Sequence, residues 1–537
     1  MITKQQQSQY RNTLFRHLDG IVIAPAAFAL HTKGVTQFLL DHKKSSLQTL
    51  TKHFDANDGY LHVALRLLCS QGWLDQELDN KEDNVNFQIN EKSTIAFSLF
   101  HLYEDVVSLQ QMSEKYPIKK FEVTPFRSLE RIVEKHKVNY NLSQTKDPLQ
   151  NEIQEQVLKH IEGTILGPTL VRLAMNGMFH KYFMQAHFRP EEFHTDAKNF
   201  GKLLDILTHY GFFQKKNKSY QFTEKGLFFA KRASAYGVTV SYIPTFRKLD
   251  ELLFGDPLSA KNASDSSKEG HVDRAMNVWG SGGAHSTYFK VVDQIIIDIF
   301  NRPIEQQPKG ILDMGCGNGA FLKHLFDVIE KLTLRGRHLD EHPLILVGAD
   351  YNEEALKITR ENLSQAEIWA KILWGDIGNP DQLAKDLKDN YNVSLDSLLN
   401  VRSFLDHNRL WSEPSTLDKN NISKSTGAFA FEGRRLSNNQ VEASLKEHFT
   451  RWAPYVNKFG LLLIELHSIS PELAAKHIGR TAVSAYDATH GFSDQYIVEA
   501  DIFHRILADM GLKRDPSLSK RFPDSDLATV TVNLFQT

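Results

Sequence analysis

Three glycines behind a short apolar run give the first indication of chemistry. In residues 309–322 the apolar run ends at Asp313, and Gly315, Gly317 and Gly319 follow at every second position. Glycine lets the backbone turn sharply and approach a ligand closely, and a helix that begins after the turn points free N–H groups at that ligand. The pattern predicts a strand, a tight turn and a helix that together bind a small molecule.

Acidic residues end this apolar run and the next two. Asp350 follows residues 344–349, and Asp376 follows the third run beside Trp374. A dinucleotide site would place a pyrophosphate at the helix start, and a carboxylate at Asp313 would repel it. The same carboxylate suits a cationic amino-acid group. Asp350 is placed to bind the two hydroxyls of a ribose, and Asp376 to lie at an adenine.

A fourth apolar run, residues 396–401, leads directly into a charged cluster. Ligands of open α/β sheets bind at the carboxyl ends of the strands, so we expect this cluster at the mouth of the site, with His407 as the candidate base. Further polar side chains follow the fifth run, residues 460–465, and the connection after it. Imidazoles that converge with carboxylate or amide oxygens could bind a divalent metal, although an ordinary polar pocket with one catalytic histidine explains the same residues. The residues concerned are Arg402, Asp406, His407, Arg409, Glu465, His467, His490 and Gln495.

The acid series resembles that of the class I S-adenosylmethionine-dependent methyltransferases over roughly residues 270–537. The stretches GSGGAHSTYF, DMGCGNG, RSFLDHNR and THGFSDQYIVE resemble the metal-dependent C-methyltransferase domains of polyketide synthase loading modules of the apratoxin type. The resemblance implies C-methylation of a carrier-bound acyl group, with a mononuclear iron, manganese or zinc ion held by His407, His490 and Gln495. The catalytic residues would be Arg402, Asp406, His407 and His490. The cofactor-binding residues would be Gly282, Tyr288, Asp313, Gly315, Gly317, Gly319, Asp350, Tyr351, Asp376, Ile377 and Asn400.

The chain departs from that setting, because it contains no recognisable carrier-protein serine motif or acyltransferase-like segment. The first alternative is therefore a metal-independent O-methyltransferase of a natural-product hydroxyl or carboxyl group, with His407 as the base. A carbon acid gains more from a metal than an oxygen nucleophile does, because coordinating both oxygens of a 1,3-dicarbonyl stabilises its enolate. Removal of bound metal would distinguish the two.

Composition limits the range of partners. The chain has 537 residues, enough for more than one domain, and 63 basic against 65 acidic residues give a net charge of −2. No overall field attracts nucleic acid or an anionic membrane. The two cysteines cannot form a disulfide framework, and the sequence shows no signal peptide and no run long enough to span a membrane. We expect a cytoplasmic protein that could form a homodimer, with a small-molecule or carrier-bound substrate.

The N-terminal half contains a duplication. Gly20, Pro25 and Gly34 recur at a constant offset as Gly163, Pro168 and Gly177. In each copy a helical apolar pattern is followed by a polar turn and a strand-like run, the pattern of a winged helix. A winged-helix regulator that senses the cofactor is therefore an alternative from another class. The helices before the wings lack the basic face that DNA binding requires, so we favour lid and dimerisation modules.

These elements define an α/β protein with a C-terminal, Rossmann-like, seven-stranded methyltransferase sheet. A mainly helical region of two winged-helix-like repeats precedes it. We expect module 1 at residues 1–150, module 2 at 151–255, a linker at 256–270 and the methyltransferase domain at 271–537. Within the last, Gly280 to Gly283 are expected to form a second glycine-rich turn, followed by a helix from about Ser286.

Overall fold

The structure, a computed structural model, describes residues 2–112, 123–261, 270–418 and 421–537, which form two compact units. The first unit comprises Met1–Ala284, Ala430–Arg435 and Ser470–Ser493. The second comprises His285–Phe429, Leu436–Ile469 and Asp494–Thr537. Each unit has its own buried core.

Two long helices, α1 (Lys4–Thr32) and α8 (Pro148–Met175), cross at the centre of the first unit. They approach so closely that a Cβ atom added to Gly20 would lie 2.2 Å from the carbonyl oxygen of His160. The reciprocal contact is the same, since a Cβ atom on Gly163 would lie 2.4 Å from the carbonyl oxygen of His17. Both helices contain an internal proline and end near a glycine with positive φ. The two segments recognised as a repeat therefore adopt the same conformation, and their shared glycines make the crossing possible.

A helix followed by a two-stranded wing occurs twice in this unit. The first copy is α4 (Asp58–Ser70), β2 (Asp75–Asp79) and β3 (Asn84–Gln88), and β1 (Lys44–Ser46) also pairs with β3. The second copy is α10 (Ala197–His209), β4 (Phe213–Lys216) and β5 (Ser219–Phe222). The other helices here are α2 (Val35–His42), α3 (Leu47–Phe54), α5 (Ser93–Leu99), α6 (Glu104–Gln111), α7 (Val123–Lys137), α9 (Lys181–Gln185), α11 (Glu224–Ala230), α12 (Ser234–Ser241), α13 (Ile243–Phe246), α14 (Leu249–Phe254), α15 (Pro257–Lys261), α21 (Pro471–Lys476) and α22 (Val483–Gly491).

Helix α1 is long and apolar enough to cross a membrane, contrary to our expectation that no segment would be. In the structure, 78% of its most apolar window is buried inside the protein. Such burial is typical of the core helix of a folded domain, and its packing against α8 explains the apolar composition.

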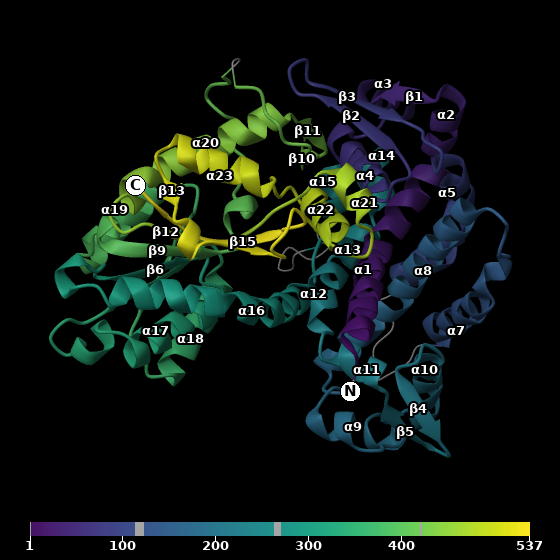
Figure 1. Ribbon diagram of the computed structural model, residues 1–537, viewed down its shortest axis with the longest axis horizontal. Helices are drawn as coiled ribbons and strands as arrows, with labels where there is room; N and C mark the ends of the chain where they lie inside the picture. Colours follow the sequence, from purple (N-terminus) through teal and green to yellow (C-terminus); the bar gives the residue numbers. More distant parts are fainter. Residues whose placement is uncertain (1, 113–122, 262–269, 419–420) are drawn as a thin grey trace. The chain divides into compact units, whose positions relative to one another are not determined.

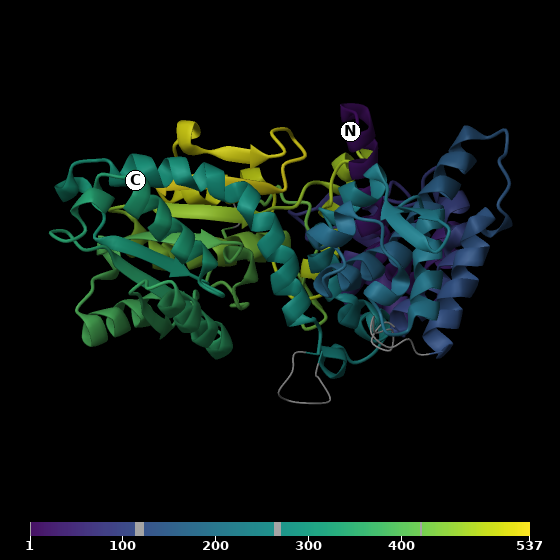
Figure 2. The same ribbon diagram turned by 90° about the horizontal axis from the view of Figure 1, so that it is seen from below.

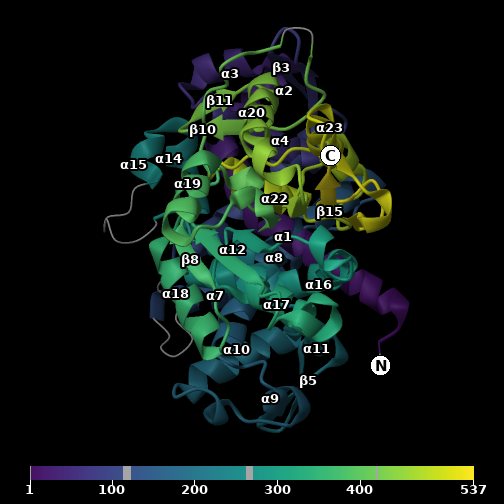
Figure 3. The same ribbon diagram turned by 90° about the vertical axis from the view of Figure 1, so that its left-hand side faces the viewer.

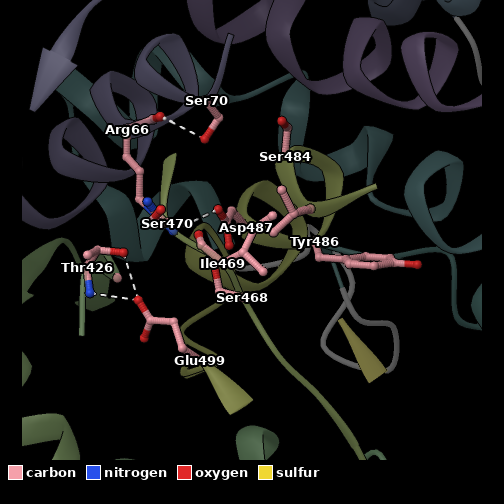
Figure 4. A network of polar contacts seen from close by, with 12 residues as sticks. Arg66, Ser70, Thr426, Ser468, Ile469, Ser470, Ser484, Tyr486, Asp487 and Glu499 are labelled. Atoms are coloured by element: carbon pink, nitrogen blue, oxygen red, sulfur yellow. Dashed lines mark hydrogen bonds and ion pairs between the residues drawn. The ribbon is translucent and has the colours of Figure 1, made fainter. Parts of the chain in front are cut away.

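Two segments from the C-terminal half belong to the first unit. The hairpin of β10 (Phe429–Phe431) and β11 (Arg434–Leu436) receives a hydrogen bond from the Gly59 amide to the Gly433 carbonyl at 2.9 Å. Helix α22 is bound to α4 by a buried ion pair, with Arg66 Nη2 3.3 Å from Asp487 Oδ2. Figure 4 shows Arg66, Asp487 and Ser484 in this region. We expected residues 271–537 to form one domain. That expectation did not include the contribution of these two C-terminal segments to the first unit.

The second unit is built on a mainly parallel sheet. Among the described residues, eight strands follow the order β13-β15-β12-β9-β6-β7-β8, with β14 paired to β15. Strands β6 to β9 and β12 are parallel, and β15 is antiparallel to β12. This is the expected methyltransferase sheet, extended by the short strand β14. The strands are β6 (Gly310–Met314), β7 (Ile345–Asp350), β8 (Lys371–Trp374), β9 (Leu398–Ser403), β12 (Leu461–Leu466), β13 (Lys513–Arg514), β14 (Lys520–Phe522) and β15 (Val530–Gln536).

Helices cover both faces of this sheet. Figures 1 and 3 show α17 (Ala320–Leu332) and α18 (Glu353–Gln365) on one face and α20 (Asn438–Val456) on the other. Helices α19 (Pro380–Tyr391) and α23 (Ala500–Asp509) lie on the α20 side. The strand order reverses between β6 and β9, which is the point where open α/β sheets bind their ligands.

The predicted turn at Gly280 to Gly283 is wrong, because helix α16 (Arg274–Phe300) runs through it (Figure 2). A Cβ atom added to Gly237 of α12 would lie 2.6 Å from the Cα atom of Gly280. Gly280 therefore serves close helix packing within the first unit rather than a turn. The predicted linker, residues 256–270, falls largely outside the described residues.

Candidate functional site

The glycine turn follows β6 as expected. Gly315, Gly317 and Gly319 have φ angles of 80°, 56° and 77°, in the left-handed region that glycine adopts without strain. Gly319 is the N-cap residue of α17. Within the described residues, no heavy atom beyond its chain neighbours lies within 4 Å of the point where a Cβ atom of Gly317 would sit. The turn thus leaves open space for a ligand at Gly317, while the amides of Gly315, Cys316 and Gly319 are hydrogen-bonded to backbone carbonyls.

The three predicted acids lie at or near the carboxyl ends of β6, β7 and β8. Asp313 is 1% exposed, and burial together with the nearby Asp350 raises the pKa of its carboxyl to about 8. Its Oδ2 atom has no hydrogen-bond partner among the described residues. Asp350 accepts hydrogen bonds from the amides of Gly317 and Asn352, both at 2.9 Å. A buried carboxyl with one oxygen unpartnered fits a cationic ligand group, and Asp350 is fixed against the glycine turn.

Aromatic side chains surround this end of the sheet. Trp374 donates its indole N–H to the carbonyl of Tyr351 at 3.0 Å, and both rings are exposed. Tyr288 of α16 packs against Phe404 and Phe522, with ring centroids 5.8 and 4.9 Å apart. Flat surfaces of this kind suit a purine ring or a sulfonium ion.

The other predicted cofactor residues are placed differently. Asn400 lies within β9, and its amide donates to the carbonyl of Tyr455 on α20 at 3.3 Å. Ile377 is buried, and its carbonyl accepts the indole N–H of Trp452 at 2.7 Å. Asp376 accepts a hydrogen bond from the Gly378 amide at 2.7 Å, and Gly282 is an exposed residue of α16. Their roles toward a cofactor stay predictions.

His407 and Glu465 form the central pair of the candidate active site. The Nδ1 atom of His407 lies 2.5 Å from Oε1 of Glu465, and both side chains are buried. Glu465 also accepts the amides of Leu466 at 2.7 Å and Asp406 at 3.0 Å. A carboxylate held in this way makes Nδ1 the protonated nitrogen, so the lone pair of neutral His407 lies on Nε2. The sequence located both residues but did not identify them as a pair.

Asp406 is the centre of a second, fully buried cluster. It accepts hydrogen bonds from Arg402 Nη1 at 2.6 Å and His448 Nε2 at 2.8 Å. Burial raises the pKa of Asp406, but Arg402 and then His448 outweigh it and hold the pKa at about 2. The Arg402 guanidinium also lies 4.0 Å from the centre of the Trp452 ring. Arg402 and Asp406 thus brace the site from within instead of lining its mouth.

His448 and Trp452 were missed because both lie on α20, away from the strand ends. A signal was present in the helical spacing, since Val441, Leu445, His448 and Trp452 recur on one face of that helix. Burial lowers the pKa of His448 to about 4, which keeps it neutral as a partner for Asp406.

The predicted metal ligands belong to different units. His407 and Gln495 lie in the second unit, whereas His490 lies on α22 in the first. The Nδ1 atom of His490 is 2.7 Å from the carbonyl of Tyr486. His467 is a core residue bonded to Thr531 Oγ1 at 2.8 Å, and burial lowers its pKa to about 3. Over the described ranges, no group of three or more His, Cys, Asp or Glu residues is arranged to hold a metal ion.

The fold and this site define a class I S-adenosylmethionine-dependent methyltransferase. Residues 269–533 match the AprA MT2-like domain family, residues 162–256 the AprA winged helix domain, and residues 10–76 the AprA N-terminal domain. Along the chain the N-terminal domain comes first, then the winged helix domain and then the MT2-like domain. The chain therefore belongs to the AprA-like methyltransferases. The match to a methyltransferase domain confirms the predicted class of protein. It gives no support to the alternative of a winged-helix regulator that senses the cofactor.

Several solved structures are similar to this chain at low sequence identity and low TM-score. The mitomycin 7-O-methyltransferase MmcR is 12% identical, and the alignment covers 72% of this chain and 99% of that one, with a TM-score of 0.42. CalO1, a methyltransferase in calicheamicin biosynthesis solved in its SAH-bound form, is 14% identical over 73% and 99%, with a TM-score of 0.36. The DszA carbon methyltransferase is 12% identical over 78% and 97%, with a TM-score of 0.28. No curated protein matches the sequence.

Proposed function

We propose that this methyltransferase acts on a small or carrier-bound acyl or polyketide substrate, with His407 as the general base. The observation that carries the proposal is the pairing of His407 with Glu465 at the ends of β9 and β12. The cofactor supplies a methyl group on a positively charged sulfur. Asp313 would hold its ammonium group, Asp350 the ribose hydroxyls, and Asp376 the adenine. The open turn at Gly317 and the partnerless Asp313 oxygen fit that assignment.

In this mechanism His407 takes a proton from the nucleophile. The proton moves to Nε2, while Nδ1–H stays bonded to Glu465, whose negative charge stabilises the imidazolium that forms. Glu465 keeps its position because two backbone amides also bind it. The buried cluster of Arg402, Asp406 and His448 holds the loop from which His407 projects.

For the nucleophile, we propose the activated carbon of a 1,3-dicarbonyl unit, with assistance from a divalent metal bound by His407, His490 and Gln495. Such a metal would stabilise the enolate oxygens. It would occupy the Nε2 lone pair of His407, because Nδ1 is bonded to Glu465, so in this case His407 would act as a ligand and a base from the solvent would take the proton. In each histidine Nδ1 faces an oxygen acceptor, Glu465 or the Tyr486 carbonyl, which is how metal-binding histidines are commonly oriented.

The second candidate is metal-independent O-methylation of a hydroxyl or carboxyl group. It is favoured by the lack of a metal-ligand cluster among the described residues. His407 with Glu465 suffices for that reaction, because an oxygen nucleophile needs only a base.

The experiment separates these possibilities with purified protein and radiolabelled S-adenosylmethionine. β-Ketoacyl thioesters, phenols and carboxylic acids serve as acceptors, each before and after exhaustive chelation. C-Methylation that chelation abolishes, and that the added metal restores, supports the first candidate. O-Methylation that chelation leaves unchanged supports the second. Methylation of any acceptor by His407→Ala at the wild-type rate would contradict both. The cytoplasmic location and the homodimer remain parts of the proposal, and size-exclusion chromatography with light scattering tests the latter.

A further inference from the structure

Phe404, directly after β9, has an unusual backbone conformation. Its φ angle is 56°, in the left-handed region that bulky side chains rarely adopt. Strained residues of this kind persist only where the surroundings impose them, and they concentrate at functional sites. The contacts of Phe404 and its neighbour Leu405 show what imposes the strain here.

The Phe404 amide donates to the carbonyl of Ile464 at 2.7 Å, one residue before Glu465. The Phe404 ring meets Tyr288, which in turn packs on Phe522. The left-handed turn therefore ties the end of β9 to β12 and directs an aromatic ring at the predicted cofactor side of the sheet.

Leu405 packs against the glycine turn. A Cβ atom added to Gly315 would lie 2.9 Å from Leu405 Cδ2. The next two residues are Asp406, whose amide binds Glu465, and His407, whose ring binds Glu465. The short segment of residues 404–407 thus contacts the glycine turn through Leu405 and ends at the proposed base, His407.

We propose that Phe404 and Leu405 are positioning residues that set the distance between the methyl donor and His407. This inference rests on the proposed function, because it needs His407 as the base and the Gly315 turn as the cofactor site. Methyl transfer requires donor and acceptor in line at contact distance, and a displacement of about 1 Å can reduce the rate about 100-fold. A loop that carries His407 and packs on the glycine turn of the proposed cofactor site would prevent such a displacement.

The test measures kcat and cofactor affinity separately. In Leu405→Ala the loop that carries His407 loses its contact with Gly315. In Phe404→Ala, Tyr288 loses one of its two ring partners and keeps Phe522. Both variants should lower kcat by about 10-fold to 100-fold, with the Kd for S-adenosylmethionine within about 3-fold of wild type. Phe404→Tyr keeps the ring and should keep kcat. The matched control is Leu410→Ala, an exposed leucine of the same loop, which should change neither quantity.

The outcomes distinguish this inference from the proposed function. If His407→Ala is inactive while Leu405→Ala and Phe404→Ala are fully active, Phe404 and Leu405 are not positioning residues. The role of His407 as the base would then still stand. Equal losses of cofactor affinity and kcat would also overturn the inference, because the residues would then belong to the cofactor site. If a variant has a lower melting temperature, Leu405→Val and Phe404→Leu supply the same comparison with less lost volume, because Phe404→Leu removes the ring and keeps an apolar side chain.

Discussion

The two units bury histidines in contrasting ways. At the helix crossing of the first unit, Nδ1 of His160 lies 2.8 Å from the Tyr103 hydroxyl. His17 there has two partners, the Tyr236 hydroxyl 2.8 Å from Nδ1 and Oε1 of Glu162 3.2 Å from Nε2. Burial lowers the pKa of both, to about 3 for His160. In the second unit, His407 faces a carboxylate at the end of a strand. His160 has a neutral hydroxyl partner, whereas a carboxylate beside a histidine can stabilise the imidazolium form. A carboxylate alone does not mark an active site, because His17 in helix α1 faces Glu162, and His407 differs from it by following the end of a parallel strand. Partner and location, more than burial, therefore indicate function.

The strongest test of this contrast is the loss of His407. We expect His407→Ala to lower kcat by about 10²-fold to 10⁴-fold, the usual contribution of a general base, with little change in cofactor affinity. His160→Gln should keep kcat and alter only stability. Steady-state kinetics measure kcat, and calorimetry with S-adenosylmethionine measures cofactor affinity. If His160→Gln lost as much kcat as His407→Ala, the distinction between a structural and a catalytic histidine would fail.

The second prediction concerns the ion pair that holds α22 in the first unit. Arg66→Met leaves Asp487 buried without its cation, and removal of one partner of a buried pair costs about 3–5 kcal/mol. The double variant Arg66→Met with Asp487→Leu should recover most of that loss. Urea unfolding of the two variants and wild type provides the measurement. If the single and double variants unfold alike, the pair does not hold α22.

The third prediction uses the pH dependence of cofactor binding. The pKa of Asp313, raised to about 8 by burial and Asp350, means that the carboxyl is protonated below that pH in the free enzyme. Pairing with a cationic ammonium group needs the carboxylate, so the affinity for S-adenosylmethionine should rise with pH up to about 8. Asp313→Asn should weaken binding by about 1–3 kcal/mol and abolish the rise. A pH-independent Kd in wild type would place the ammonium group elsewhere.

The smallest effect is expected at the helix crossing. Gly20→Ala and Gly163→Ala would place a Cβ atom against the backbone of the opposite helix and should each cost about 1–3 kcal/mol. Gly201 of α10 is the matched control, since its Cβ atom would lie 3.5 Å from Pro190 Cγ, an ordinary contact. Gly201→Ala should stabilise the protein by about 0.5–1 kcal/mol, the difference in helix propensity. Differential scanning calorimetry compares the three variants.

The sequence predicted the parts of the site that lie close together along the chain. The Gly315 turn, Asp350 and the loop with His407 could be found because each follows directly from an apolar strand. Contacts made by distant segments were not predictable in this way. Asp406 meets His448 from a helix, Gly280 packs on Gly237 rather than forming a turn, and His467 turns back into the core. Local patterns specify elements, whereas these contacts depend on how the elements pack.

The segment Ser470–Ser493 has a consequence for biosynthesis. It completes the first unit, yet the ribosome produces it only after most of the methyltransferase sheet. Until then the faces of α1 and α4 that receive α22, including the buried Arg66, have no covering helix. Exposed apolar surface in a growing chain promotes aggregation and recruits chaperones. The first unit therefore cannot bury these faces until Ser470–Ser493 has been synthesised, after most strands of the enzyme domain.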